Sequence, residues 1–592
     1  MRKVCICKTA TLSAMGLTVD ELWQGLMRRK SALQPVERFS TEKYVSVYAG
    51  TIDALNDCHG RMAEALLDLL LNDFGELPPN TRLIGATAKG GIDVLERYFQ
   101  KNEGCPAVDS PVSVLRKLKN RLNLSEEAIN INAACASSTI AVAHGASLIA
   151  NGLADSVLVV AFDILSEFVF SGFSALKGMS PTPSRPFDRE RDGLSLGEGA
   201  GAILLTSTDM ADTSGLHPKA YVAGWGCAND ANHITAPAKD GFGLIKAVNE
   251  ALAMAGLLPT DIGAINAHGT GTIYNDLMEI TAACSVFGDT GKPMHSIKGA
   301  IGHTLGAAGA IEVAVAIKAL EEQLIPPTTG LTTADPAGAS MLSTAPQPFE
   351  SRYILTSNSG FGGINGVLIL ETPGTDTLES EAHPPALSAH ITGIGWVTPD
   401  GLGHLRQGAR FSSGKGPLPE LARKDVFPEP YKRFGRLDAF SKVGLSAITL
   451  AMRDAAQEEW TEKRPFGIVA ATDYGCLKTD MEYFKTALPN HGQFASPNLF
   501  AYTLPNCFLG EAAIRFGLAG SNFVLNSTET VTSNALKVSL KELAMGTSGK
   551  LLCGYNNPEL EHGPADRQVG GLFFVLETEA DEMSYGQVSL EG

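Results

Sequence analysis

The sequence predicts an α/β protein made of two related parts of unequal length. Strand-like and helix-like segments alternate over residues 1–205 and again over residues 218–371, which is the pattern of sheets covered by helices. A chain of 592 residues is too long for one ordinary hydrophobic core, so more than one domain is expected. A stretch in the last third of the chain also repeats a stretch of the first third.

Hydrophobic spacing predicts the elements of the first part. Residues 19–29 carry apolar side chains at helical spacing after Thr18, a residue suited to cap a helix N-terminus. Residues 82–87 and 156–162 are apolar runs of strand length. Residues 200–205 add a further strand, and the small and apolar residues 139–154 indicate a buried helix.

The same reasoning applies to residues 218–371. Residues 244–255 and 306–322 are predicted helices, and residues 262–267 are a predicted strand. Residues 357–363, Ser-Asn-Ser-Gly-Phe-Gly-Gly, are predicted to form a flexible turn that enters a strand at residues 366–370.

A linker and a repeat follow. Residues 372–388 are polar, acidic and rich in proline, which is typical of a linker. In residues 389–592, Asn526 aligns with Asn132 and Gly546 with Gly152, and both pairs are 394 residues apart. This constant offset places Glu529 at the position of Cys135. The repeat has no counterpart of residues 218–371, so the sequence indicates an internal duplication with one truncated member.

Composition disfavours several kinds of partner. The chain has 47 Lys and Arg against 64 Asp and Glu, and its formal charge of −17 disfavours nucleic acid and anionic membranes. Residues 128–154 carry no charged side chain, but polar residues interrupt them, which fits a buried helix better than a membrane span. No signal-peptide core follows Met1, and the ten cysteines include no Cys-x-x-Cys pair, so we expect a cytoplasmic protein with reduced thiols.

Cys135 lies at the turn between a strand-like segment, residues 128–132, and the predicted helix that follows. A thiol at that turn would face the free N–H groups and the positive end of the helix, which favour the thiolate. Small residues on both sides leave room for a substrate carbonyl. On this stretch alone, a buried structural cysteine fits the sequence equally well. The choice depends on partners elsewhere in the chain.

His268, His303 and Lys298 are those partners. His268 opens a His-Gly-Thr-Gly-Thr segment after a predicted strand, and His303 follows Lys298 in a glycine-rich segment. A thiolate can hold an acyl group as a thioester, and imidazoles can stabilise an oxyanion or enolate or transfer protons. A single histidine at a strand end is more often structural, but this combination in one chain favours acyl transfer.

Five motifs resemble those of the β-ketoacyl synthases, the thiolase-fold condensing enzymes of fatty acid and polyketide synthesis. They are residues 134–138, 185–189 with 192–193 and 197–201, 268–272 with 275–276, 298 with 302–309, and 360–365. Their order and spacing cover residues 1–371, although residues 4–8 depart from the usual opening of the family. The resemblance implies a thiolase-like layered α/β/α/β/α fold for residues 1–371, with halves at 1–205 and 218–371, and half of that fold for residues 389–592.

The resemblance also implies a decarboxylative Claisen condensation. Cys135 would accept an acyl chain from an acyl carrier protein, and His268 and His303 would promote decarboxylation of malonyl-carrier protein. Lys298 and Glu312 would organise the histidines.

Further roles are implied around the thiol. The amides of Cys135 and Phe361 would form an oxyanion hole, and Phe361 would also act as a gate. Thr270 and Thr272 would contact the phosphopantetheine arm. Neither a metal nor a bound cofactor is implied, since phosphopantetheine arrives on the carrier protein.

Residues 389–592 are similar to the N-terminal half of the same family, with residues 391–399 like its opening and residues 501–506 and 510–511 like the stretch before the nucleophile. Glu529 cannot form the same thioester intermediate, and both histidines are missing. This part therefore resembles a chain-length factor, the inactive partner of a synthase. We expect an intramolecular pseudo-dimer. The sequence leaves open the acyl length, the primer, the product and any further oligomer, although residues 165–173 resemble synthases of aryl-polyene pathways.

Two other functions stay open at this point. One is a cysteine-dependent acyltransferase or hydrolase of the same fold that does not elongate its substrate. The other is a non-catalytic scaffold that docks carrier proteins. Cys135, His268, His303 and Lys298 argue against the scaffold for the first domain and leave it open for the second.

Overall fold

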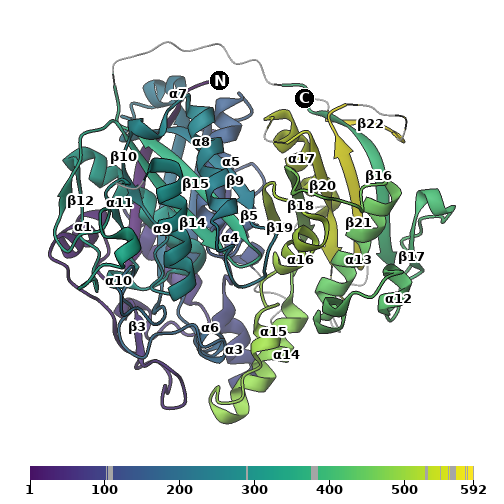
Figure 1. Cartoon of the computed structure of the whole chain (residues 1–592), viewed down its shortest axis with the longest axis horizontal. Helices are drawn as coiled ribbons and strands as arrows, with labels where there is room; N and C mark the ends of the chain where they lie inside the picture. Colours follow the sequence, from purple (N-terminus) through teal and green to yellow (C-terminus); the bar gives the residue numbers. More distant parts are fainter. Residues whose placement is uncertain are drawn as a thin grey trace.

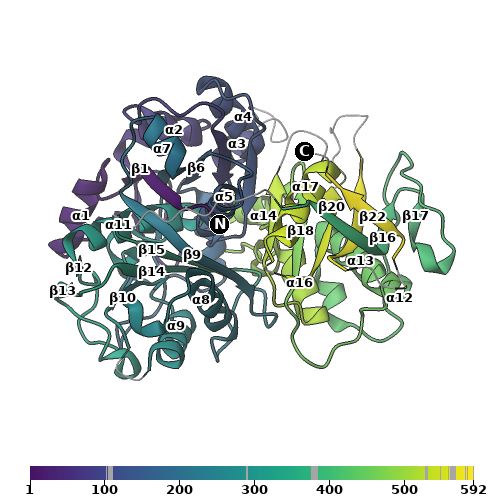
Figure 2. The same cartoon turned by 90° about the horizontal axis from the view of Figure 1, so that it is seen from above.

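The computed structural model describes residues 1–101, 103, 111–288, 291–374, 385–526, 531–546, 548–557, 559, 568–579, 582 and 584–590. Two blocks lie side by side, the first coloured purple to teal and the second green to yellow (Figures 1 and 2). The first block ends with β15 (Ile364–Glu371) and the second begins with β16 (Ser388–Thr398). The predicted linker lies between these strands, and its residues 375–384 fall outside the described part.

The first block contains two sheets with the same pattern of strand directions. The first sheet has the order β1 (Val4–Ser13), β8 (Gly199–Ser207), β6 (Ser156–Asp163), β4 (Arg82–Ala86), β5 (Ile129–Asn132). The second has the order β9 (Ala220–Asn229), β15, β14 (Tyr353–Gly360), β10 (Ile262–Asn266), β11 (Met294–His295). In both sheets the first two pairings are antiparallel and the last two are parallel. A short β1–β9 pairing through Cys5 and Ile6 connects them.

Helices form three layers around these sheets. Helices α5 (Ser137–Ala150) and α11 (Ala308–Glu322) lie between the sheets, and every residue of α5 is buried. Helix α2 (Met62–Leu71) packs on the first sheet, while α8 (Phe242–Ala255) and α9 (Ile273–Phe287) cover the second. The predicted α/β/α/β/α layering is therefore confirmed, and a charge-free helix such as α5 is explained by its place in the central layer.

The second block repeats the first sheet. Its strands have the order β16, β21 (Gly570–Glu577), β20 (Lys550–Asn557), β18 (Phe466–Thr472), β19 (Asn522–Asn526), with the same directions. Helix α17 (Val531–Ala544) packs with Leu551 and Cys553 of β20, and α13 (Ala439–Asp454) packs with the intervening Leu552. Because alternate residues of a strand face opposite sides, the two helices cover opposite faces of the sheet.

The offset of 394 residues holds at the level of structure. It places α5 on α17 and β6 on β20 from the first residue to the last. Beyond β16, the short β22 (Gly586–Ser589) pairs at the sheet edge, as β9 does beyond β1.

The two blocks share one line of strand pairing. β5 and β19 pair antiparallel, with Asn132 opposite Val524 and Asn130 opposite Asn526. The Asn130 amide also donates to Asn526 Oδ1 at 3.0 Å. Figure 1 shows these two strands side by side at the centre of the molecule.

Shorter elements complete the described chain. They are the helices α1 (Val19–Met27), α3 (Ile92–Lys101), α4 (Pro111–Arg121), α6 (Glu167–Ala175), α7 (Thr208–Thr213), α10 (Lys298–Ile301), α12 (Arg423–Val426), α14 (Leu477–Ala487), α15 (Pro497–Phe500) and α16 (Cys507–Phe516), and the strands β2 (Gln34–Pro35), β3 (Tyr48–Gly50), β7 (Leu196–Gly197), β12 (Leu324–Ile325), β13 (Gln347–Pro348) and β17 (Gly401–His404).

One predicted element is wrong. Residues 357–360 were expected in a flexible turn, but they form the end of strand β14 and are paired along their length with β15. Their polar side chains suggested a loop, whereas Asn358 is fully buried and hydrogen-bonded. Only residues 361–363 form the turn.

Candidate active site

Cys135 sits in a tight turn between β5 and α5. Ala134 adopts a left-handed backbone conformation with φ of +52°, which turns the chain sharply before the thiol. The Ser137 hydroxyl fixes this turn, because it donates to the Ala134 carbonyl at 2.6 Å and accepts from the Ala133 amide at 2.9 Å. Gly360 presses against the same turn, where an added Cβ would lie 3.1 Å from the Cys135 nitrogen. The thiol is therefore held in one position.

His268 and His303 converge on the thiol. His268 follows the C-terminal end of β10, and His303 follows α10. The Cys135 sulfur and one ring nitrogen of each histidine all lie within 4.8 Å of one another. The two imidazoles meet edge to face, with ring centres 5.1 Å apart and planes at 84°. Residues far apart in sequence thus form one cluster.

Hydrogen bonds fix the tautomer of each histidine. The Leu305 amide donates to His303 Nδ1 at 3.3 Å, so Nδ1 is an acceptor and Nε2 carries the proton. Asn358 lies with Nδ2 2.7 Å from the Glu312 carboxylate and 3.0 Å from His268 Nδ1. A carboxylate only accepts, so this Asn358 atom is the donor, and His268 also carries its proton on Nε2. Both imidazoles are neutral donors.

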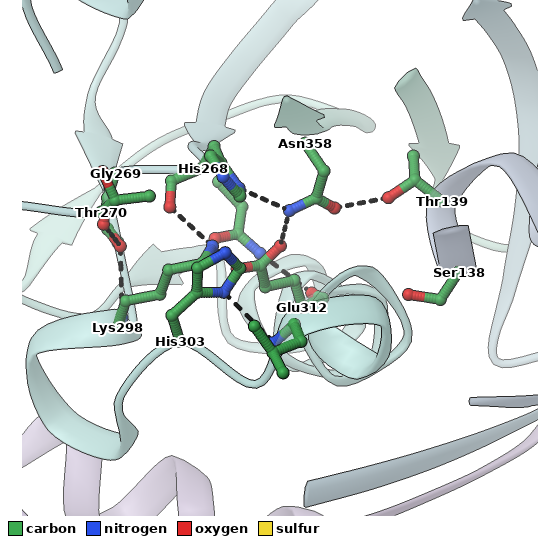
Figure 3. A network of polar contacts seen from close by, with 12 residues as sticks. Ser138, Thr139, His268, Gly269, Thr270, Lys298, His303, Glu312 and Asn358 are labelled. Atoms are coloured by element: carbon green, nitrogen blue, oxygen red, sulfur yellow. Dashed lines mark hydrogen bonds and ion pairs between the residues drawn. The ribbon is translucent and has the colours of Figure 1, made fainter. Parts of the chain in front are cut away.

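Lys298 and Glu312 form the buried charge pair behind the histidines (Figure 3). Lys298 Nζ lies 2.5 Å from Glu312 Oε1 and donates to the His268 carbonyl at 2.6 Å. Thr139 of α5 donates to Asn358 Oδ1 and so connects the central helix to this network. The network fixes His268 through both its backbone and its ring.

Burial sets the protonation of the cluster. It lowers the pKa of His268 and of His303 well below the usual range, and Lys298 lowers both further. Burial also raises the pKa of the Cys135 thiol to about 12, although Lys298 opposes that shift. The expectation that the helix end favours a resting thiolate is therefore wrong, because the loss of water around the sulfur outweighs it. The resting site holds a neutral thiol and two neutral imidazoles.

Two acidic residues of α9 hold the His-Gly-Thr-Gly-Thr segment. Glu279 accepts from the amides of His268 and Gly269, each at 2.7 Å. Asp276 accepts from the Thr270 amide at 3.0 Å. These hydrogen bonds from backbone amides to the two acidic side chains fix the segment that carries His268.

A cavity of about 420 Å³ leads to the thiol. Thr270 and Thr272 line it, and their hydroxyls lie 2.9 Å apart. Its inner end is formed by Cys135, the two histidines and Phe361. Thr270 and Thr272 therefore face the same cavity as the thiol and both histidines.

Phe361 belongs to the Phe361 loop, residues 360–363. Gly362 and Gly363 have φ of +88° and +78°, values that favour glycine. Within the described part of the chain, the amides of Cys135 and Phe361 donate to no other residue, so both N–H groups are free to bind an oxyanion. The Phe361 ring packs against Phe173 at 5.8 Å.

A second, small cavity of about 30 Å³ also borders the thiol. Cys135 and Phe361 line both cavities. The second block contributes Phe500, Thr503 and Leu504 to the small cavity. The site is therefore completed across the domain boundary.

The structure brings together all the site residues predicted in the first domain: Cys135, His268, His303, Lys298, Glu312, Phe361, Thr270 and Thr272. Glu529 lies outside the described residues. Sequence reasoning missed Asn358, Thr139 and Glu279. Thr139 directly follows the motif at residues 134–138, and Glu279 lies three residues after Asp276, so nearness to a motif was a usable signal. Asn358 was hidden in a segment that looked like a loop.

Cys135, His268 and His303 are also residue types that bind zinc. The expectations that the protein needs no metal and no resident cofactor stay predictions. In the described part of the chain, no helix has both the length and the apolar character needed to cross a membrane.

Comparisons with known proteins agree with this geometry. Residues 117–211 match the family "Beta-ketoacyl synthase, N-terminal domain", and residues 219–332 match "Beta-ketoacyl synthase, C-terminal domain". The 3-oxoacyl-[acyl-carrier-protein] synthase 2 of Vibrio cholerae is 31% identical over 410 residues, which are 62% of this chain and 99% of the relative. The 3-oxoacyl-[acyl-carrier-protein] synthase 2 of Rhizobium meliloti is 30% identical, over 62% of this chain and 99% of the relative.

The chain belongs to the β-ketoacyl synthase family. It is an acyltransferase-type condensing enzyme of fatty acid or polyketide synthesis. Among solved structures, the ishigamide ketosynthase/chain length factor is similar with a TM-score of 0.56 and 29% identity, over 63% of this chain and all of that one. The PfaC keto synthase–chain length factor has a TM-score of 0.80 and 17% identity, over 99% of this chain and 80% of that one, which shows a shared fold for both blocks.

Proposed function

We propose that this β-ketoacyl synthase condenses an acyl group held on Cys135 with malonyl carried by an acyl carrier protein. One observation carries the proposal: the thiol and the two neutral imidazoles lie within 4.8 Å at the end of a cavity. Cys135 is the nucleophile, and His268 and His303 are hydrogen-bond donors.

In the first half-reaction, the acyl group passes from the carrier to Cys135. The sulfur attacks the acyl-carrier thioester, and the free amides of Cys135 and Phe361 stabilise the tetrahedral oxyanion. The C–S bond to phosphopantetheine breaks, and the proton of Cys135 leaves with the carrier thiol. Because the thiol is protonated at rest, its proton passes to the departing carrier thiolate as the C–S bond breaks.

In the second half-reaction, malonyl-carrier protein enters the same cavity. Its C–C bond breaks and carbon dioxide leaves, while His268 and His303 donate hydrogen bonds to the thioester oxygen that becomes the enolate. The enolate carbon attacks the Cys135 thioester, a C–C bond forms, and the C–S bond breaks. The electron pair returns to the sulfur, which takes up a proton, and the β-ketoacyl chain stays on the carrier.

The cavity suits a phosphopantetheine arm. Thr270 and Thr272 face it with paired hydroxyls, which can exchange their mutual hydrogen bond for bonds to the amides of the arm. In this proposal the acyl and malonyl groups both arrive on an acyl carrier protein, and no further cofactor takes part.

The second domain shapes the acyl pocket. Phe500, Thr503 and Leu504 close the small cavity beside the thiol. The proposal treats the molecule as an intramolecular pseudo-dimer in which residues 389–592 act as a chain-length factor. The β5–β19 pairing and the His144–Glu542 contact of 2.9 Å support this arrangement.

Mass spectrometry of the intact protein tests the function. We expect acyl-carrier protein to add an acyl group to Cys135, and malonyl-carrier protein to remove it with release of carbon dioxide. Cys135→Ala should take up no acyl group. An adduct that water removes without carbon dioxide release from the malonyl donor would favour a hydrolase, and the absence of any adduct would contradict the mechanism.

A further inference from the structure

The Phe361 loop is held on one side by the first domain. Gly362 donates to the Ile234 carbonyl at 2.7 Å, and its own carbonyl accepts from Asn229 Nδ2 at 2.8 Å. The Gly363 carbonyl accepts from the Asp230 amide at 2.7 Å. These bonds fix the C-terminal part of the loop, and among the described residues of the first domain none donates to the Phe361 carbonyl.

Asn506 of the second domain supplies that partner. Its Nδ2 donates to the Phe361 carbonyl at 2.8 Å, and the residue is 1% exposed. The peptide that follows Phe361 is therefore fixed across the domain boundary. Since Phe361 also presents the free amide next to the thiol, this contact lies one residue from the reacting atoms.

The Asn506 side chain does not cap the helix at whose N-terminus it lies. The residue is the N-cap of α16, where an asparagine oxygen ordinarily accepts from the first turn of the helix. Here the side chain makes no capping bond, and within the described part of the chain its buried Oδ1 has no hydrogen-bond partner. An unpaired buried oxygen is costly, and such costs are typical of sites under a functional constraint.

Helix α16 reaches the loop because two glycines meet. A Cβ added to Gly510 would lie 2.7 Å from the Cα of Gly362, and one added to Gly362 would lie 2.8 Å from Asn506 Nδ2. Glycine inside a helix costs about 0.5–1 kcal/mol relative to alanine. Gly510 therefore lowers the stability of α16 slightly and allows the helix to contact the Phe361 loop closely.

We propose that Asn506 is a positioning residue for the condensation. By holding the Phe361 carbonyl, it fixes the loop so that the Phe361 amide faces the thioester carbonyl during acyl transfer to Cys135. This inference rests on the proposed function and extends it, because it gives the second domain a role in positioning the oxyanion hole.

Asn506→Leu tests the inference in the full-length protein. Leucine keeps the size of the side chain, removes the donor and also removes the unpaired oxygen. We expect the rate of Cys135 acylation by acyl-carrier protein to fall about 10- to 100-fold, since losing one oxyanion donor outright costs about 100- to 1,000-fold in other enzymes. The fall should appear in kcat, with KM for the carrier protein unchanged.

A second reaction of the same site separates positioning from general damage. Decarboxylation of malonyl-carrier protein, measured in the Cys135→Ala background, depends on the histidines and should not change when Asn506→Leu is added. The melting temperature should stay close to the wild-type value, because removal of the unsatisfied buried oxygen offsets the loss of the hydrogen bond to the Phe361 carbonyl. Asn522→Leu is the matched control: it removes another buried amide with no hydrogen-bond partner among the described residues of the second domain, and it should acylate like the wild type.

The outcomes are distinct. Acylation of Asn506→Leu at the wild-type rate would overturn the inference alone. Equal losses of acylation and decarboxylation, with a lower melting temperature, would also overturn it by showing a purely structural role. A wild-type protein that takes up no acyl group would overturn the proposed function itself.

Discussion

Helices α5 and α17 occupy equivalent places in the two domains, and their sequences show what the missing half of the second domain changes. Every residue of α5 is buried and none is charged, because α11 and a second sheet cover its other side. In α17, Lys537 replaces Ala143 and is exposed, and Lys541 replaces Ser147. The same backbone element therefore carries charge where no second sheet covers it. His268, His303 and Lys298 lie in the half that only the first domain keeps, whereas Cys135 lies in the half that both domains share.

The first prediction concerns separation of the two domains. A chain of residues 1–374 should aggregate and lose Cys135 acylation, because it exposes the edge of β5 and the apolar contacts of the Phe361 loop. Size-exclusion chromatography and acyl loading measure this outcome.

Co-expression of residues 385–592 as a separate chain is the control. It should restore a soluble pair that loads acyl groups, since the contacts between the domains do not depend on the linker. A soluble and fully active fragment of residues 1–374 would contradict the view that the second domain completes the first.

The second prediction concerns the charge pair behind the histidines. Lys298→Met leaves the Glu312 carboxylate buried without its partner, so the free energy of unfolding should fall by about 3–5 kcal/mol. Condensation should fall at least about 100-fold, because His268 loses a bond that fixes its backbone. Denaturant titration and carbon dioxide release measure the two effects.

The double variant Lys298→Met with Glu312→Gln separates the effect on stability from the effect on activity. The double variant should regain most of the stability and little of the activity. Recovery of both together would show that the pair serves folding alone.

How far the sequence could predict this molecule differs between its parts. The strands, the offset of the repeat and the motif residues could be predicted because they depend on local spacing and on residue type. The role of Asn358 could not be predicted, because a polar strand end looks like a loop in the sequence. Only the structure shows that Asn358 donates a hydrogen bond to the buried Glu312. The raised pKa of the Cys135 thiol could not be predicted either, because it comes from the burial of the thiol by layers that pack around its turn.

The third prediction tests how the second domain limits the acyl pocket. Lys89 lines the small cavity and forms a buried ion pair of 2.7 Å with Asp480 of the second domain. A cavity of about 30 Å³ has room for only a short acyl group. The double variant Lys89→Met with Asp480→Leu should therefore load longer chains than the wild type from an equal mixture of acyl-carrier proteins.

The matched controls are the two single variants. Each leaves one buried charge unpaired and should be less stable than the double variant, with a coupling free energy of about 0.5–3 kcal/mol. An unchanged distribution of adduct lengths in the double variant would show that this ion pair does not limit the pocket.

The fourth prediction follows from the pKa of the Cys135 thiol, which burial raises to about 12. Below that value the thiolate fraction changes about tenfold per pH unit, so alkylation of Cys135 should speed up steadily from pH 7 to pH 9 without a plateau. The unfolded protein, with an ordinary thiol pKa of about 8.5, should level off instead. A folded-state plateau near pH 7 would indicate a resting thiolate. Lys298→Met should slow the alkylation further, because that lysine lowers the thiol pKa.

The smallest expected effect concerns the counterpart of the nucleophile. Glu529→Cys restores a thiol at the position that the offset aligns with Cys135, yet the second domain lacks residues that correspond to His268, His303 and Lys298. A thiol without those partners has no hydrogen-bond donors for the enolate, so condensation should stay at the wild-type rate with one acyl group per chain. Cys135→Ala with Glu529→Cys should remain inactive. A second acyl group, located on residue 529 by peptide mass spectrometry, would show that a thiol at this position needs none of those partners and that the half kept only by the first domain is not what separates the two.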